Sequence, residues 1–314
     1  MKAALIYSYG SPDVLELHSE VKIPEPQANE VLIRVRAAGI NPVDCKLRKG
    51  AFKLFTGFMF PKILGFDVAG EVVGIGNRVS HFRIGDAVMG LLQSFNQGSY
   101  AQFTVAKQNI LVQKPKNLSF EESAAVPLAG LTAFQALSKG GIENGMRVLI
   151  LGGAGGVGSF AVQIAKTYDC TVTASAGPNN QLFLRELGAD FTFDYTCQTV
   201  ADLDGKFDIV VDAVGRSSFA ACRPILTSRG SYITTLPTWT NAGSLLFSPL
   251  RAQAAKVFLT RSSHRDLQIL KKLIEKGRIR PIIDRNYSLE QIREAHLYVQ
   301  AEHVRGKTVI TMPD

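Results

Sequence analysis

A glycine-rich stretch near the middle of the chain has the spacing of a pyrophosphate cradle. An apolar run at 148–151 leads into Gly153-x-Gly155-x-x-Gly158, and a helix-compatible pattern follows. In such a turn the first glycine bends without a Cβ, the second lets the backbone approach phosphates, and the third lets helix pack on strand. The helix start also favours an anion. An ordinary strand-to-helix turn is the alternative. We expect a dinucleotide to contact Gly153, Ala154, Gly155, Gly156, Val157 and Gly158.

The region after the next strand indicates which nicotinamide cofactor binds. Sites for NAD commonly carry an acidic residue about 20 positions past the first glycine. Here that region reads Thr173-Ala-Ser-Ala-Gly177, without a carboxylate, which favours NADPH over NADH. No Arg or Lys directly follows, so the phosphate clamp is incomplete. Ser175, Asn180 and Tyr195 are the expected hydrogen-bond donors to the 2′-phosphate.

Three further positions follow strands expected later in the chain. Gly215 ends one strand, and Thr235 and Leu236 end the next. Ligands bind at the carboxyl edge of parallel sheets, so we expect backbone contact with the nicotinamide half there. A plain strand-ending turn is the alternative.

The elements that position these residues form a regular α/β alternation. Strands are expected at 171–175, 191–193, 207–211, 231–235 and 256–259, with helices at 181–187 and 217–226. This order predicts a doubly wound parallel sheet. The segment before it has short alternating runs and turn signals, which predict an antiparallel β-rich domain.

The length of 314 residues favours two domains. Ser119-x-x-Glu122 resembles a capping box that opens a helix into the second domain. The last fifty or so residues contain an expected helix at 266–275, an extended 281–284, a helix from 288 and a strand at 307–311. They are too short for a domain, so we expect residues 1–120 and 262–314 to form one domain and 121–261 the other.

Composition excludes several classes of protein. The chain is 46% hydrophobic with net charge +8, and no uncharged apolar run reaches the length of a membrane span. The start lacks the pattern of a secretory signal, and four scattered cysteines form no CxxC pair, so a reducing cytoplasm is expected. The basic charge raises nucleic acid or a membrane surface as partners. The densest basic stretch, at 271–285, interleaves apolar residues at helical spacing, which favours a solvated helix face over a nucleic-acid site.

Several ordered motifs together resemble one family. They include Ala38-Gly-Ile-Asn-Pro-Val-Asp44, Leu64-Gly-Phe-Asp67, Gly98-Ser-Tyr-Ala101, Ala129-Gly-Leu-Thr-Ala133 and the tail His303-Val-Arg-Gly-Lys307. Nearly the whole chain is similar to medium-chain dehydrogenases/reductases, in the zinc-independent quinone oxidoreductase branch. The resemblance implies a GroES-like catalytic domain, a Rossmann domain, an NADPH-dependent reaction on a small quinone or enone, and usually a homodimer.

The expectation that zinc is absent rests on particular positions. Zinc-dependent relatives use a Cys after a Gly-x-Asn-like strand, a Gly-His-Glu, and a later Cys or Asp. Here the stretches read Gly39-Ile-Asn41 and Gly65-Phe66-Asp67, and Phe66 cannot ligate a metal. Without a Lewis acid to polarise a carbonyl, the expected acceptor is one that conjugation already makes electrophilic, such as an enone or quinone. Hydride then goes to the β-carbon of an enone, and charge develops on oxygen near hydrogen-bond donors.

By resemblance, Asn41 is the first candidate donor, Asp44 lies on the same turn, Thr132 sits beside the nicotinamide, and Lys307 contacts the cofactor. Alternatively Asn41 is a turn residue, and Asp44 pairs with Arg48 at i,i+4.

The acceptor pocket is expected at Phe52 and Phe66. Phe52 stands where some relatives have a tyrosine, so the final proton is expected from solvent. The segment 51–61, which also holds Phe55, Phe58 and Phe60, could line an apolar acceptor site or belong to the core. Two other functions stay open: a zinc-type alcohol dehydrogenase, and a non-catalytic protein that binds NADPH or RNA.

Overall fold

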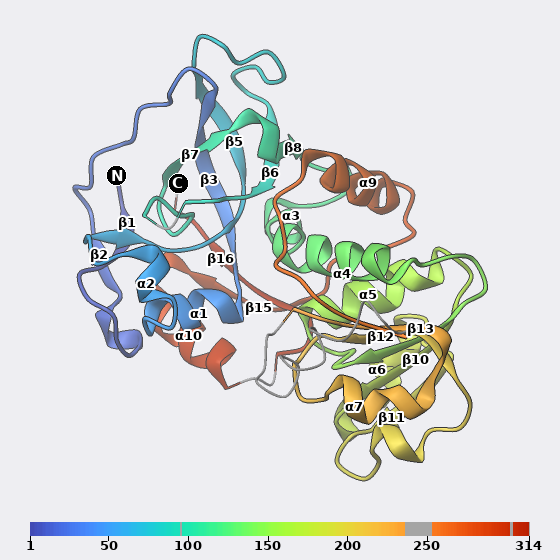
Figure 1. Ribbon diagram of the computed structural model, residues 1–314. Coiled ribbons are helices and arrows are strands. Elements are labelled where there is room, and N and C mark those ends of the chain that lie inside the picture. Colours follow the sequence, from blue (N-terminus) through green and yellow to red (C-terminus); the bar gives the residue numbers. More distant parts are fainter. Residues whose placement is uncertain (95, 236–252, 302–303, 314) are drawn as a thin grey trace. The chain divides into compact units, whose positions relative to one another are not determined.

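The computed structural model describes residues 1–94, 96–235, 253–301 and 304–313. The chain divides into two compact units (Figure 1). The first contains Met1–Leu128, Ser262–Glu275 and Pro281–Asp314, and the second contains Ala129–Arg261 and Lys276–Arg280. No helix in these described ranges has the length and apolar character to cross a bilayer.

The second unit is built on a parallel six-stranded sheet in the order β11-β10-β9-β12-β13-β14. Its strands are β9 (Arg147–Leu151), β10 (Thr171–Ala176), β11 (Phe191–Asp194), β12 (Phe207–Asp212), β13 (Leu226–Thr234) and β14 (Ala254–Val257). The helices here are α4 (Pro127–Gly140, which begins in the first unit), α5 (Gly156–Lys166), α6 (Gln181–Glu186) and α7 (Phe219–Cys222), with 3-10 turns at Pro178–Asn180, Val200–Asp202 and Arg223–Ile225. The chain runs outward from β9 in both directions, as the predicted doubly wound fold requires.

Two elements of this sheet differ from the sequence prediction. The helix expected at 217–226 is only the single turn α7, followed by a 3-10 turn that contains Pro224. A proline lacks the N–H that an α-helix needs and clashes with the preceding turn, so the helix stops there. The last strand lies at Ala254–Val257 rather than 256–259, in register with Ser231 to Thr234 of β13.

The first unit is rich in antiparallel strands, as predicted. A seven-stranded sheet has the order β15-β16-β3-β5-β6-β8 with β7 on β3, and a small sheet has the order β2-β1-β4. The strands are β1 (Ala3–Ile6), β2 (Glu16–His18), β3 (Glu30–Ile40), β4 (Lys62–Ile63), β5 (Asp67–Ile75), β6 (Ala87–Leu91), β7 (Phe103–Lys107), β8 (Leu111–Gln113), β15 (Ile283–Ser288) and β16 (Lys307–Thr311). Strand β16 pairs with β3, so the end of the chain completes the sheet that its beginning starts.

Short helices surround this sheet. They are α1 (Pro42–Arg48), α2 (Lys53–Thr56), α3 (Phe120–Ala124), α9 (His264–Glu275) and α10 (Ile292–Gln300), with 3-10 turns at Pro12–Val14, Gln108–Ile110 and Leu289–Gln291. Helix α9 buries Leu267, Leu270 and Ile274 and exposes Lys272, which is the amphipathic pattern expected for its basic stretch.

The predicted capping box is present. The Ser119 hydroxyl accepts from the Glu122 N–H at 3.1 Å, and the Glu122 carboxylate accepts from the Ser119 N–H at 2.8 Å. It opens α3, which ends at Ala124 and packs on β3 and β5 of the first unit. The box therefore does not start a helix of the second unit, as the sequence had suggested.

Candidate active site

The glycine turn between β9 and α5 is held by the neighbouring strand. The Gly152 N–H donates to the Ser175 hydroxyl at 3.1 Å, and the Gly153 N–H donates to the Ser175 carbonyl at 2.8 Å. The Gly155 N–H in turn donates to the Gly152 carbonyl at 3.2 Å. The turn thus has a fixed shape set by backbone hydrogen bonds to the carboxyl end of β10.

Each glycine of the turn meets a different degree of crowding. A Cβ on Gly158 would lie 2.1 Å from the Gly152 carbonyl oxygen, and one on Gly153 would lie 2.8 Å from Leu184 Cδ2. A Cβ on Gly155 would meet nothing nearer than 3.7 Å. Gly158 therefore serves close packing, whereas Gly155 leaves open space beside the start of α5. Gly155, Gly156 and Val157 are half-buried, while Gly153, Ala154 and Gly158 are buried.

Gly152 is a residue that the sequence analysis missed. Its φ of +78° lies in the left-handed region, and a Cβ there would come 2.5 Å from Val214 Cγ1. Glycine is the residue that adopts such a conformation readily. The signal was the doubled glycine directly after the strand.

The expected 2′-phosphate donors gather at the carboxyl ends of β10 and β11. Ser175 is buried and its hydroxyl oxygen accepts from Gly152, so it shapes the turn. Asn180 ends a 3-10 turn and is half-buried, and Tyr195 is 49% exposed. The Tyr195 hydroxyl lies 3.4 Å from where a Cβ on Gly177 would be. Asn180 and Tyr195 thus follow adjacent strands on the same edge, and their contact with a phosphate stays a prediction.

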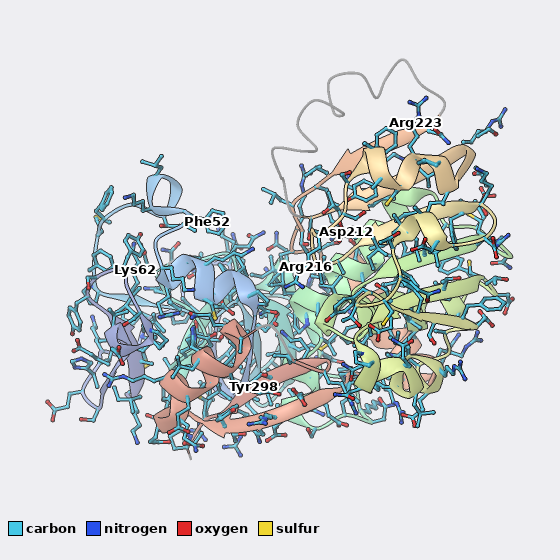
Figure 2. The ribbon with its side chains drawn as sticks, turned by 90° about the horizontal axis from the view of Figure 1, so that it is seen from below. Phe52, Lys62, Asp212, Arg216, Arg223 and Tyr298 are labelled. Atoms are coloured by element: carbon cyan, nitrogen blue, oxygen red, sulfur yellow. The ribbon has the colours of Figure 1, made fainter. Side chains whose placement is uncertain are left out.

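A buried carboxylate, also missed from the sequence, organises the loop after β12. Asp212 is 1% exposed, and its Oδ1 accepts from the Gly215 N–H at 2.7 Å and the Val214 N–H at 3.2 Å. Its Oδ2 accepts from the Ser217 N–H at 3.0 Å and the Tyr232 hydroxyl at 2.8 Å. Gly215 has a φ of +67° within this loop, and Figure 2 labels Asp212 at its base.

The remaining predicted residues of the second unit are Thr132, Thr235 and Leu236. Thr132, on α4, is 4% exposed and its hydroxyl lies 2.7 Å from that of Thr260. Thr235 directly follows β13 and is half-buried, and Leu236 lies outside the described residues.

The first unit brings Asn41, Asp67 and Lys307 together in a buried cluster. The Asn41 amide nitrogen donates to Asp67 Oδ2 at 2.9 Å, and the Asn41 amide oxygen accepts from the Lys307 ammonium. Lys307 Nζ also lies 3.2 Å from Asp67 Oδ2 and donates to the Ile40 carbonyl at 3.0 Å. The other Asp67 oxygen accepts from the Leu128 N–H at 2.7 Å. Lys307, expected as a cofactor ligand, thus has its ammonium turned onto Asn41.

Asp44 lies beside this cluster at the start of α1. Its Oδ2 accepts from the backbone N–H of Asn41 at 2.7 Å, which fixes the entry to the helix. Burial raises the pKa of Asp44 to about 7, and the negative charge of Asp67 adds to this effect. The backbone hydrogen bond from Asn41 and the Lys307 charge lower the pKa by less. Asp44 therefore holds its proton up to neutral pH.

The alternative of an ion pair between Asp44 and Arg48 is not seen, because Arg48 bonds to other groups. The Arg48 guanidinium donates to the Gly10 carbonyl at 3.1 Å and to the Gln300 side chain at 2.8 Å. Arg48 is fully buried, and its role is to tie α1 to α10 and to the chain near Gly10. A cation directed elsewhere leaves Asp44 without a salt-bridge partner in this part of the structure.

Three other buried groups pack behind Asp44. Burial and the charge of Asp44 raise the pKa of Tyr100, and burial lowers the pKa of His296 to about 3, so both stay neutral. Burial likewise raises the pKa of Cys45 to about 12, and its thiol lies 3.5 Å from His296 Nδ1. These three groups add no charge beside Asp44.

The aromatic segment after α1 is largely exposed. Phe52 is 39% exposed and Phe58 is 66% exposed, so the core interpretation does not hold for these two rings. Phe60 packs edge-on to Tyr9 with ring centres 5.0 Å apart, and Phe66 is half-buried against the core of the first unit. The Phe55 side chain is outside the described parts. A pocket role for Phe52 and Phe66 stays a prediction.

Comparison with known proteins places the chain in a family. Residues 27–116 match the alcohol dehydrogenase GroES-like domain, and residues 187–310 match the family described as zinc-binding dehydrogenase. The chain is 38% identical to 2-methylene-furan-3-one reductase from Solanum lycopersicum and 35% identical to the chloroplastic NADPH-dependent alkenal/one oxidoreductase from Arabidopsis thaliana. Each match covers 99% of this chain and 79% of the relative.

A solved structure agrees with these relatives. The quinone oxidoreductase from Coxiella burnetii superposes with a TM-score of 0.91 at 34% identity, over 100% of this chain and 99% of that one. In the described residues, no set of three His, Cys, Asp or Glu side chains is placed to hold a metal ion. The chain belongs to the medium-chain dehydrogenase/reductase family, among its quinone and enone oxidoreductases.

Proposed function

We propose that the protein uses NADPH to reduce a conjugated acceptor, a quinone or an α,β-unsaturated carbonyl, without zinc. The observation that carries the proposal is the Asn41–Asp67–Lys307 cluster. Zinc-dependent relatives place metal ligands in the corresponding stretches, where this chain has Asn41 and Phe66. Asp67 is already paired with an ammonium group 3.2 Å away, and that cation opposes a metal ion. The relatives named for alkenal/one and furanone reduction support the same chemistry.

The second unit has groups suited to the cofactor. Space beside Gly155 and the N-terminus of the eleven-residue α5 fit a pyrophosphate. Asn180 and Tyr195 would meet the 2′-phosphate, and Gly215, Thr235 and Thr132 the nicotinamide half. Bound NADPH supplies the hydride that a conjugated acceptor takes up.

In the first unit, Asn41 would stabilise the charge that develops on the acceptor oxygen. An amide nitrogen has two hydrogens, and the hydrogen bond to Asp67 uses one of them. Lys307 on the amide oxygen polarises the group and strengthens the remaining N–H as a donor. Asn41 is 3% exposed, so it is desolvated and held in place. Phe52 and Phe66 would contact the apolar part of the acceptor, and the final proton would come from solvent.

The test is NADPH oxidation with matched panels of enones, quinones and simple alcohols or ketones. We expect turnover of conjugated acceptors and none of simple alcohols, with Asn41→Ala lowering kcat roughly 100-fold and leaving the NADPH Kd unchanged. Asn117→Ala is a control elsewhere in the first unit, where the Asn117 side chain donates to the Ile274 carbonyl at 2.9 Å. Stoichiometric zinc with alcohol oxidation would overturn the proposal.

Cofactor preference and assembly need separate measurements. Fluorescence titration should give a lower Kd for NADPH than for NADH, and equal values would remove the preference. We further propose a homodimer in a reducing compartment such as the cytoplasm, which suits four free cysteines, three of them buried. Light scattering that gives the 34.1 kDa monomer mass would contradict the dimer.

A further inference from the structure

The segment from Lys46 to Pro61, which we call the apolar–basic segment, exposes large apolar side chains at an unusual density. Leu54 is 84% exposed, Phe58 is 66% exposed and Met59 is 76% exposed. Elsewhere in the described chain, exposed large apolar side chains are spread singly or in loose pairs. Single exposed apolar residues are ordinary, whereas a run of them marks an interaction surface.

The charged residues of this stretch have one sign. Between Cys45 and Phe66 the sequence contains no Asp or Glu. Of its five basic residues, Arg48 and Lys62 are buried, and Lys46, Lys49 and Lys53 are exposed. Three exposed ammonium groups therefore belong to the same stretch of chain as the apolar side chains, and no acidic residue lies between Cys45 and Phe66.

The segment is braced from behind, so its apolar side chains are presented on a fixed support. The buried Lys62 ammonium donates to the Thr56 carbonyl at 2.9 Å and to Asn96 Oδ1 at 3.0 Å. The Tyr9 hydroxyl lies 2.7 Å from Thr56 Oγ1 and donates to the Gly57 carbonyl at 2.5 Å. Figure 2 labels Phe52 and Lys62 in this part of the first unit.

We propose that the apolar–basic segment docks on the surface of an anionic lipid bilayer. Exposed aromatic and aliphatic side chains bordered by lysines are the pattern that inserts at the headgroup boundary and is attracted by acidic lipids. The lysines favour an anionic bilayer over a purely apolar partner, because such a partner would have no negative charge to attract them. The inference does not depend on the reductase activity.

The test is sedimentation of the full-length protein with vesicles, without NADPH. One vesicle contains phosphatidylcholine with about a third phosphatidylglycerol, and the other contains phosphatidylcholine alone. Each lysine near an acidic surface strengthens binding about fivefold, so three lysines should favour the acidic vesicle by roughly 100-fold. High salt should abolish most of this difference because it screens exposed charges.

Two variants separate the segment from bulk charge. Lys46→Gln/Lys49→Gln/Lys53→Gln should lose most of the preference, and Leu54→Ser/Phe58→Ser should weaken binding at low salt by at least tenfold. The matched control Lys272→Gln/Lys276→Gln/Arg278→Gln removes the same charge from exposed positions of another region and should bind like the wild type. Circular dichroism melting checks that all variants fold.

Three results would overturn the proposal: no binding of the wild type to acidic vesicles, equal loss in the control variant, or unchanged binding in both segment variants. A segment variant that binds vesicles normally but loses enone turnover would show that the segment serves the acceptor alone.

Discussion

Gly155→Ala and Gly158→Ala each add one methyl group to the glycine turn. The first should weaken cofactor binding, and the second should lower stability. A methyl at Gly158 would lie 2.1 Å from the Gly152 carbonyl oxygen and 2.7 Å from Gly153 Cα. Both neighbours are backbone atoms, so the start of α5 must move by more than about 1 Å to relieve the contact. Overpacking of this kind costs about 1–3 kcal/mol. The melting temperature should then fall by roughly 2–12 °C.

Gly155→Ala should leave stability nearly unchanged. The nearest atom to its added methyl is 3.7 Å away, and its φ of −77° suits alanine. Alanine is a poorer N-cap than glycine, but it also lowers the entropy of the unfolded chain, and the two effects of about 0.5–1 kcal/mol offset each other. The methyl nevertheless occupies the side on which a pyrophosphate would approach. The Kd for NADPH should rise at least tenfold, about 1.4 kcal/mol.

Thermal unfolding without cofactor and fluorescence titration with NADPH distinguish the two outcomes. If Gly155→Ala binds NADPH within threefold of the wild type, the pyrophosphate does not sit against this backbone. If Gly158→Ala melts like the wild type, the close approach of α5 to the turn is wrong. Only the combination of a stable, weak-binding Gly155→Ala and a destabilised Gly158→Ala supports the assigned roles.

Three further substitutions test buried charge and cofactor choice. The raised pKa of Asp44, about 7, contributes stability that is complete below about pH 4 and is lost as the pH rises towards 7. The lowered pKa of His296, about 3, has the opposite effect, because its contribution to stability is lost as the pH falls from 6.5. As the pH falls from 6.5 to about 4, the wild type gains stability from Asp44 and loses it from His296. Asp44→Asn lacks the gain, so its free energy of unfolding should fall by up to about 3 kcal/mol more than that of the wild type. Parallel curves of urea unfolding against pH would contradict the raised pKa. Lys307→Met should lower the free energy of unfolding by roughly 3–5 kcal/mol because it leaves the buried Asp67 charge without its cation. Adding Asp67→Asn in the same chain should restore most of this loss, and an equal loss in the single and double variants would refute the pairing. Gly177→Asp adds a carboxylate after β10, where the nearest atom to a Cβ is 3.4 Å away. The carboxylate should repel a 2′-phosphate, so the Kd should rise about 10-fold or more for NADPH and little for NADH, with Gly177→Asn as the uncharged control. An equal rise for both cofactors would show that no 2′-phosphate lies there.

The parts of the fold that sequence predicts well are those with local signals. The strand, glycine turn and helix at residues 147–166 lie within one continuous stretch, so periodicity and glycine spacing are enough to place them. The helix expected at 217–226 failed where a single residue, Pro224, outweighed the apolar pattern. The role of Asp212 in the loop after β12 was missed because its hydrogen bonds with Ser217 and Tyr232 depend on the folded loop and on the neighbouring strand β13.

The Asn41–Asp67–Lys307 cluster is harder to predict because its members are far apart in the chain. Asn41 and Asp67 are 26 positions apart, and Asn41 and Lys307 are 266 apart. Resemblance identified Asn41 and Lys307 separately and assigned Lys307 to the cofactor. The pairing of β16 with β3 brings the Lys307 ammonium against the Asn41 amide, and a contact between Lys307 and the cofactor stays a prediction.

Burial is the main reason that Asp44 keeps its proton, and the charge of Asp67 adds to its effect. Asp44 and the neighbouring cluster together contain two carboxyl groups and one ammonium, and Lys307 lies against Asp67 while Arg48 bonds elsewhere. An ionised Asp44 would leave one uncompensated negative charge beside Asn41. In the proposed reaction that charge would oppose an oxyanion on the acceptor, because like charges a few ångströms apart repel by on the order of a few kcal/mol at an effective dielectric of about 20. A neutral Asp44 accepts from the Asn41 backbone N–H through Oδ2 without this cost, so in the proposed reaction the same carboxyl would fix the donor and add no negative charge near the acceptor.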